Sequence, residues 1–171
     1  MKVLVTGGVR SGKSRHAEEL LAGRDDVVYV AAGPVVDDAD WAARIAAHRA
    51  RRPATWATLE TCDLAAALAR PEAVLVDCLG TWLTGVLDER SLWESPVEQV
   101  TGVVQELVDA AAARLRGRDD AVLVTNEVGL GVVPAHRSGR LFRDLLGSVN
   151  QAFGAACDEV HLVVAGRVLV L

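Results

Sequence analysis

The sequence has few aromatic residues, few cysteines and no long hydrophobic run. Aromatic residues make up 4% of its 171 residues while 51% are hydrophobic, so Ala, Val and Leu must supply most of the core. The three cysteines are widely spaced and form no CxxC pair, which argues against a disulfide framework or a metal cluster and fits a reducing compartment. The longest apolar stretch, VVYVAAGPVV, is too short and too interrupted to span a bilayer. We therefore expect a soluble, cytoplasmic protein.

The charge balance is acidic, which restricts the possible partners. Lys and Arg number 18 against 23 Asp and Glu, a formal net charge of −5. Broad electrostatic binding of nucleic acid requires a basic face, so no nucleic-acid partner is expected, although a local anion site is compatible with this balance. No repeat or linker divides the chain, and its length predicts a single domain over residues 1–171.

Short, continuously apolar runs recur along the sequence, as strands buried on both faces of a sheet require. These runs are KVLVT (2–6), VVYVA (27–31), AVLVD (73–77), AVLVT (121–125) and VHLVV (160–164). Segments with helical spacing alternate with them, at 12–22, 38–50, 62–69, 97–116 and 137–156. This alternation predicts an α/β fold with a mostly parallel sheet and helices on both faces.

Two other features complete the predicted sheet. The last apolar run, VLVL (168–171), follows Gly166–Arg167, which predicts a two-residue turn and a C-terminal antiparallel edge hairpin. Residues 32–60 and 78–96 have no regular pattern, and both follow predicted strands. They should therefore lie at the carboxyl end of the sheet, where open α/β folds bind ligands.

The first predicted strand is followed by GGVRSGKS, which matches the phosphate-binding pattern Gly-x4-Gly-Lys-Ser and leads directly into a helical segment. Glycines let backbone amides approach the phosphates, and the helix N-terminus offers them partial positive charge. Lys13 is expected to reach the terminal phosphates, and the Ser14 hydroxyl to bind Mg²⁺. The motif predicts a nucleoside triphosphate site made by Gly7, Gly8, Val9, Arg10, Ser11, Gly12, Lys13 and Ser14.

Acidic side chains stand at the ends of two other predicted strands. Asp77 follows four apolar residues and could hold Mg²⁺ or cap the helix that comes next; beside a phosphate-binding loop we favour the magnesium role. Asn126 and Glu127 follow another strand in the same way. Glu127 could order water around the metal, contact the substrate or cap a turn.

Residues 44–53, RIAAHRARRP, form a basic stretch in this acidic chain. The helix dipole explains why bases come at the end of the predicted helix, but Arg44, His48 and Arg52 are also four residues apart and share one helical face. Surrounding cations would favour a neutral imidazole, which could attack a phosphorus atom and form a covalent nucleotidyl intermediate. A structural role for His48 is the alternative. Among the other histidines, His16 is expected to face solvent and His161 to pack within a strand.

Taken together, several segments make the chain similar to the bifunctional adenosylcobinamide kinase / adenosylcobinamide-phosphate guanylyltransferases of cobalamin biosynthesis. The segments are LVTGGVRSGKSRHAE, RIAAHRARRPATW, VLVTNEVGLGVVP, FRDLLGSVNQ and DEVHLVVAG, in family order and over nearly the whole chain. The resemblance implies a RecA-like P-loop NTPase fold, a homotrimer and two reactions. Adenosylcobinamide is phosphorylated with ATP or GTP, and GMP is then transferred from GTP to adenosylcobinamide phosphate, giving adenosylcobinamide-GDP and pyrophosphate.

The resemblance also assigns roles to residues. The guanylylated histidine falls on His48, which has Ala47 beside it where many relatives have a second histidine. Catalysis is implied for His48 and Lys13, and Mg²⁺ binding for Ser14 and Asp77. Beyond residues 7–14, the implied nucleotide contacts are Ala31, Ala32, Gly33, Arg49, Ala50, Arg51, Arg52, Glu60 and Asp77. Two alternatives stay open: a P-loop kinase for another small hydroxylated molecule, and a switch-type nucleotide-binding protein.

Overall fold

A computed structural model describes residues 1–33 and 52–171 of the chain. The described strands form one seven-stranded sheet in the order β3-β2-β4-β5-β1-β6-β7. The strands are β1 (Lys2–Gly7), β2 (Val27–Ala31), β3 (Ala57–Glu60), β4 (Ala73–Asp77), β5 (Ala121–Val124), β6 (Glu159–Val164) and β7 (Arg167–Val170). Neighbouring strands from β3 to β6 are parallel, and β7 returns antiparallel to β6. The predicted mostly parallel sheet with an antiparallel edge hairpin is confirmed.

The turn of that hairpin lies one residue earlier than predicted. Val164 pairs with Arg167, so the two turn residues are Ala165 and Gly166 rather than Gly166 and Arg167. Their φ angles are 49° and 76°, and two successive positive values are typical of the type I′ turn, whose twist matches that of paired strands.

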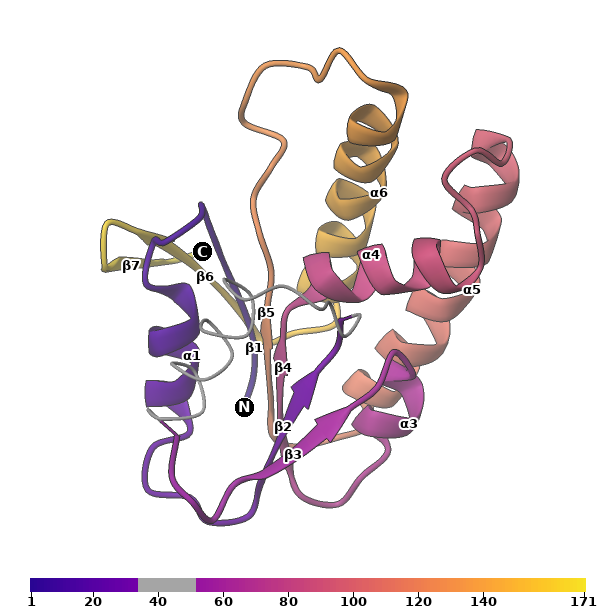
Figure 1. The fold of residues 1–171 in the computed structure, drawn as a ribbon. Helices are drawn as coiled ribbons and strands as arrows, with labels where there is room; N and C mark the ends of the chain where they lie inside the picture. Colours follow the sequence, from indigo (N-terminus) through magenta and orange to yellow (C-terminus); the bar gives the residue numbers. More distant parts are fainter. Residues whose placement is uncertain (34–51) are drawn as a thin grey trace.

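Helices cover both faces of the sheet (Figure 1). Those in residues 1–33 and 52–171 are α1 (Lys13–Leu20), α3 (Leu64–Leu68), α4 (Leu79–Glu89), α5 (Val97–Arg116) and α6 (Arg137–Gly154). Of these, α1 packs on one face and α3 to α6 on the other. On one face Ala17 of α1 packs in a core cluster with Leu75 of β4. On the other, α3 to α6 enclose a larger cluster that includes Val76, Trp82 and Phe153. Within the described residues no helix has the length and apolarity needed to cross a bilayer.

Two elements lie in segments that the sequence predicted to be irregular. β3 is a four-residue edge strand with mostly exposed side chains, so it has no apolar run to reveal it. α4 contains Gly80 and Gly85, which weaken a helical pattern, but a capping box between Cys78 and Thr81 starts it and seven of its residues are buried. Tertiary packing therefore decides the structure of both segments. The helix predicted at 38–50 lies outside the described residues.

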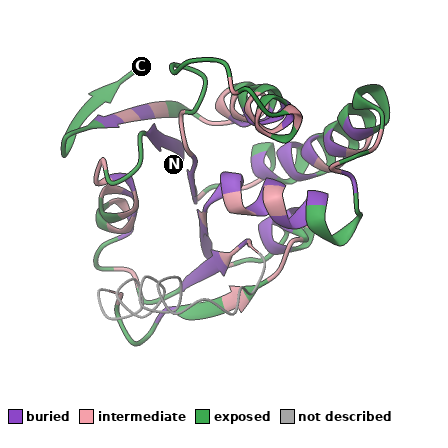
Figure 2. Cartoon of the chain, turned by 45° about the horizontal axis from the view of Figure 1, so that its top comes forward, coloured by how far each residue is buried: buried purple, intermediate pink, exposed green. Residues whose placement is uncertain are grey.

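The β7 edge of the sheet is exposed, as Figure 2 shows in green at the C-terminal strand. Its four residues include Val168, Leu169 and Val170, and all four are exposed. Such an edge strand has unpaired backbone groups and apolar side chains. Proteins usually cover it with another element or place charged side chains on it.

Candidate active site

The phosphate-binding loop joins the end of β1 to the start of α1. Gly12 caps the helix with a left-handed φ of 99°, and because it has no side chain, no capping group occupies the first amides of α1, which could therefore bind an anion. Lys13 is the first residue of the helix and its side chain is 9% exposed. Its Nζ donates a hydrogen bond of 3.1 Å to Gly8 O, which holds the ammonium group across the loop. The loop thus has the backbone donors and the buried cation that the motif predicts.

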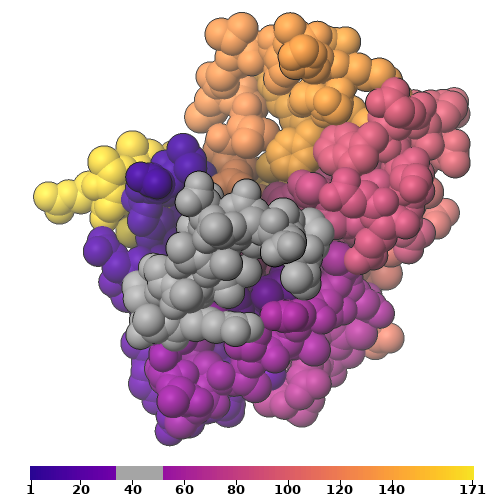
Figure 3. All heavy atoms as spheres, viewed as in Figure 1, coloured from indigo at the N-terminus to yellow at the C-terminus, as the bar shows by residue number. Residues whose placement is uncertain are grey.

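The C-terminal hairpin supports this loop from the side. Gly166 N–H donates to Ser11 O at 2.8 Å, so the β6–β7 turn is tied to the middle of the loop. A Cβ on Gly7 would lie 2.4 Å from Val163 O, which explains why only glycine fits where β1 ends against β6. In Figure 3 the hairpin, in yellow, lies against the indigo amino-terminal segment.

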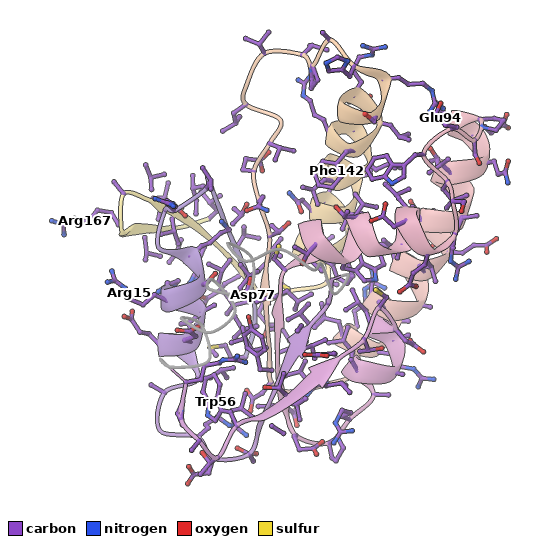
Figure 4. The ribbon with its side chains drawn as sticks, viewed as in Figure 1. Arg15, Trp56, Asp77, Glu94, Phe142 and Arg167 are labelled. Atoms are coloured by element: carbon purple, nitrogen blue, oxygen red, sulfur yellow. The ribbon has the colours of Figure 1, made fainter. Side chains whose placement is uncertain are left out.

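The ends of β4, β5 and β1 bring the other predicted residues to the same edge of the sheet. β5 lies between β4 and β1, and Asp77 at the end of β4 is in register with Val124 of β5. Glu127 N–H, just beyond β5, donates to Gly7 O at 3.2 Å. Figure 4 shows Asp77 between α1 and the start of α4. The residues that follow β5 therefore lie between the phosphate-binding loop, which follows β1, and Asp77 at the end of β4.

Asn126 and Glu127 are held in place by their neighbours. Asn150 of α6 donates from Nδ2 to Asn126 O at 3.0 Å and accepts from the Thr125 hydroxyl at 2.6 Å. Glu127 Oε1 accepts from Gly129 N–H at 3.3 Å, so its carboxylate caps the turn that follows β5. The capping role that the sequence allowed for Glu127 is present. Asn150 was not singled out, because its partner is far away in the sequence.

Asp77 has a buried partner that the sequence did not reveal. The Tyr29 hydroxyl of β2 lies 3.3 Å from Asp77 Oδ2 and donates to it. Burial and the negative charge of Asp77 raise the pKa of Tyr29 above its ordinary value, so the phenol stays protonated. The Arg52 guanidinium lies over the Tyr29 ring, 3.5 Å from its centroid. Three side chains from separate segments thus meet at this point.

The remaining residues predicted to contact the nucleotide do not all lie beside the phosphate-binding loop. Ala32 is fully buried, and Gly33 abuts α4 so closely that a Cβ would lie 2.8 Å from Thr81 Cβ. Glu60 is exposed at the end of edge strand β3, four strand spacings from β1, which is roughly 19 Å at the usual interstrand distance. Glu60 therefore stands apart from the phosphate-binding loop. His48, Arg49, Ala50 and Arg51 lie outside the described residues.

His16, expected to face solvent, is partly buried and bonds to His161. His16 Nε2 is 2.8 Å from His161 Nδ1, and His161 Nε2 is 2.8 Å from Glu159 Oε2. An ionised carboxylate only accepts, so His161 donates from Nε2 to Glu159, and in the tautomer with its proton on Nε2 its Nδ1 accepts from His16. Burial lowers the pKa of His16 below its ordinary value, and the neighbouring His161 lowers it further. His161 itself is buried within its strand, as predicted.

The predicted metal ligands offer the right chemistry for Mg²⁺. Ser14 supplies a hydroxyl and Asp77 a carboxylate, and Mg²⁺ is usually held by one or two carboxylates together with substrate phosphates. This donor set fits Mg²⁺. Among the described residues no group of three or more His, Cys, Asp or Glu is placed to hold a metal.

Comparison with known proteins gives a family match over almost the entire chain. Residues 3–171 match the family model described as cobinamide kinase / cobinamide phosphate guanyltransferase. The bifunctional adenosylcobalamin biosynthesis protein CobU of Salmonella typhimurium is 42% identical, and that of Escherichia coli 43%; each alignment covers 97% of this chain and 97% of the relative. The corresponding protein CobP of Pseudomonas aeruginosa is 42% identical over 97% of this chain and 94% of its own length.

A solved structure also aligns with the chain. The P4 protein of bacteriophage phi6 in complex with ADP covers 98% of this chain and 54% of its own, with 18% identity and a TM-score of 0.48.

Proposed function

Because the chain belongs to the cobinamide kinase / cobinamide phosphate guanyltransferase family, we propose that it performs both reactions of that name at one nucleotide site. The substrates are adenosylcobinamide and its phosphate, with ATP or GTP as the phosphoryl donor and GTP as the source of GMP. The observation that carries the proposal is the phosphate-binding loop, with buried Lys13 at the head of α1 and Asp77 beyond the adjoining β5 strand.

In the kinase reaction the substrate hydroxyl attacks the γ-phosphorus of the nucleotide. The bond to the β-phosphate oxygen breaks, and the nucleoside diphosphate leaves. Phosphoryl transfer depends mostly on positioning and on neutralising charge. Lys13 and the amides at the start of α1 supply positive charge to the phosphates, and Asp77 and Ser14 would hold Mg²⁺, which would add further positive charge at the phosphates.

In the guanylyl transfer His48 attacks the α-phosphorus of GTP. A phosphorus–nitrogen bond forms, the α–β phosphoanhydride bond breaks, and pyrophosphate leaves. A phosphate oxygen of adenosylcobinamide phosphate then attacks the same phosphorus, so that the histidine is released and adenosylcobinamide-GDP is formed. A covalent intermediate of this kind divides one difficult transfer into two easier ones.

The proposal extends to the state of the protein. Residues 1–171 act as one catalytic domain in the cytoplasm, and three copies assemble into a trimer. The exposed apolar side chains of β7 support assembly, since a partner would cover them.

Labelling with GTP that carries radioactive α-phosphate tests the guanylyl transfer. After incubation with Mg²⁺ and denaturation, the protein should keep a label that acid removes and alkali does not, as a phosphorus–nitrogen bond to histidine requires. His48→Ala should lose the label, and the matched variant His136→Ala should keep it. An unlabelled wild-type protein, or full labelling of His48→Ala, would refute the covalent route.

A parallel incubation with GTP labelled at the γ-phosphate, with and without cobinamide, separates the two alternative functions. A kinase for another small molecule would transfer γ-phosphate to its substrate without any α-label on the protein. A switch-type protein would hydrolyse nucleotide slowly, at a rate that cobinamide does not change.

A further inference from the structure

Tyr29 is the single tyrosine of the chain, and it lies in the buried middle of β2. Its side chain is 6% exposed and belongs to the core cluster on the α1 face of the sheet. A phenylalanine would fill this position equally well if packing were the only demand on it. The hydroxyl therefore calls for a separate explanation, because a buried phenol needs a hydrogen-bond partner.

The partner of the hydroxyl is the carboxylate at the end of β4. Tyr29 is in register with Leu75 of the neighbouring strand, two residues before Asp77, so side chains of the two strands point to the same face. The hydroxyl donates to Asp77 Oδ2 at 3.3 Å, which engages one oxygen and fixes the rotation of the carboxylate. Outer partners that orient a metal-binding carboxylate in this way commonly set the affinity for the metal.

The ring of Tyr29 has a second partner on its face. The Arg52 guanidinium lies 3.5 Å from the ring centroid, the geometry of a cation–π contact. The negative charges of Asp77 and of Glu18 on α1 also act on the Tyr29 phenol, and the positive charge of Arg52 opposes them. The ring thus holds a cation beside two carboxylates at the edge of the nucleotide site.

We propose that Tyr29 is a positioning residue, which orients the Asp77 carboxylate through its hydroxyl and the Arg52 guanidinium through its ring. The inference rests on the proposed function, in which Asp77 binds Mg²⁺ and Arg52 contacts the nucleotide. It assigns to Tyr29 two separable effects, one on magnesium through the oxygen atom and one on the nucleotide through the aromatic face.

Two substitutions separate these effects. Tyr29→Phe removes the hydroxyl and keeps the ring, whereas Tyr29→Leu removes both. Val27→Ala serves as the control for lost packing, because Val27 is buried on the same face of the same strand. Binding of a fluorescent, non-hydrolysable GTP analogue is titrated with Mg²⁺ and in EDTA, and thermal unfolding checks that each variant is folded.

Tyr29→Phe should need roughly tenfold more Mg²⁺ for half-maximal binding, with unchanged binding in EDTA. We expect this lower end of the range for outer partners, because the separation of 3.3 Å exceeds the ~2.7–2.8 Å of most O–H···O bonds. Tyr29→Leu should in addition bind the analogue about fivefold more weakly in EDTA, and Arg52→Gln should match it there. Wild-type magnesium dependence in Tyr29→Phe, or equal binding of the Phe and Leu variants in EDTA, would overturn the inference.

A spectroscopic measurement tests the hydroxyl contact without turnover. Since the chain has a single tyrosine, ¹³Cζ-labelled tyrosine gives one NMR signal that reports on the Tyr29 oxygen. The signal should move when Mg²⁺ is added to the nucleotide-bound protein, and stay in place in Asp77→Asn. A signal that Mg²⁺ leaves unmoved in the wild-type protein would contradict the inference.

Asp77→Asn also distinguishes failure of the inference from failure of its premise. If Asp77→Asn keeps the wild-type magnesium dependence, the magnesium role of Asp77 is wrong and the inference falls with it. If Asp77→Asn loses that dependence while Tyr29→Phe keeps it, the proposed function stands and the inference about Tyr29 is wrong.

Discussion

Lys13 is a charged side chain that the fold buries at the head of a helix. Burial of an ammonium group is costly, and Lys13 is 9% exposed with its Nζ donating to Gly8 O. Such an arrangement is understandable where the cation serves a ligand with several negative charges. At the scale of single residues, this is the clearest sign of function in the described chain.

Lys13→Ala should lower the rate of γ-phosphate transfer to cobinamide by at least about 100-fold, because the phosphates lose their principal cationic partner. The rate is measured with γ-labelled nucleotide and saturating Mg²⁺. Arg15→Ala is the matched control, since Arg15 lies exposed on the same helix and pairs with Glu19. Near-normal turnover of Lys13→Ala would show that the loop is not the phosphate site.

His16 gives the stability of the protein a pH dependence. Burial, and to a smaller extent the neighbouring His161, hold the pKa of His16 below its ordinary value of 6.5. The imidazole of His16 therefore takes up a proton less readily in the folded protein than in the unfolded chain. The free energy of unfolding should therefore decrease as the pH falls below 6.5, and level off below the lowered pKa of the folded state.

Urea unfolding at several pH values checks this prediction. His16→Gln should show a shallower fall in the free energy of unfolding below neutral pH, because its share of the proton uptake is gone. His136→Gln, at an exposed position before α6, should keep the wild-type slope. Identical slopes for wild type and His16→Gln would contradict the assignment.

At this scale the sequence predicted what depends on neighbours along the chain. The phosphate-binding loop follows from the spacing of Gly7, Gly12 and Lys13, and the structure has the strand, the loop and the helix there. Tyr29 could not be found in the same way, since its contacts depend on the pairing of β2 with β4. A lone tyrosine in an apolar run reads as a core residue until the strand order is known.

At the scale of elements, Arg118 connects three segments at the amino end of the sheet. It follows α5 and donates to the carbonyl oxygens of Leu68, Glu72 and Asp120. Leu68 ends α3, and the other two carbonyls belong to the loops that enter β4 and β5. One guanidinium therefore satisfies a carbonyl at the end of α3 and one carbonyl in each of the two loops.

Arg118→Ala should lower the free energy of unfolding by about 2 kcal/mol, because the three carbonyls lose a charged donor. Urea denaturation measures the change. Arg116→Ala, an exposed residue of the last turn of α5, should differ from wild type by less than about 0.5 kcal/mol. Equal effects of the two substitutions would mean that the carbonyls find other donors.

The elements that the sequence missed share one property. The pattern of β3 and α4 is weak locally, and both are stabilised by contacts with distant parts of the chain: β3 pairs with β2, and α4 packs against α6. The strongly apolar strands β1, β2, β4 and β5 were found nearly to the residue, because burial on both faces leaves a continuous pattern.

At the scale of the whole molecule, the exposed β7 edge bears on assembly. A homotrimer would cover apolar side chains that a monomer leaves in water. Light scattering should give a mass three times the 18.1 kDa of the chain. Leu169→Lys should reduce that mass if β7 lies in the interface, whereas Glu94→Lys, on the opposite side of the molecule in Figure 4, should not. A wild-type mass of one chain would refute the trimer.

The strand order has a consequence for how the protein is made. β1 leaves the ribosome first, yet its two neighbours in the sheet are β5 and β6, which are synthesised late. The loop after β1 is also tied to Gly166, which emerges later still. We therefore expect that nucleotide does not act as an early folding ligand of the nascent chain. Retention of ribosome-bound chains on immobilised nucleotide should begin only once the C-terminal hairpin has cleared the exit tunnel.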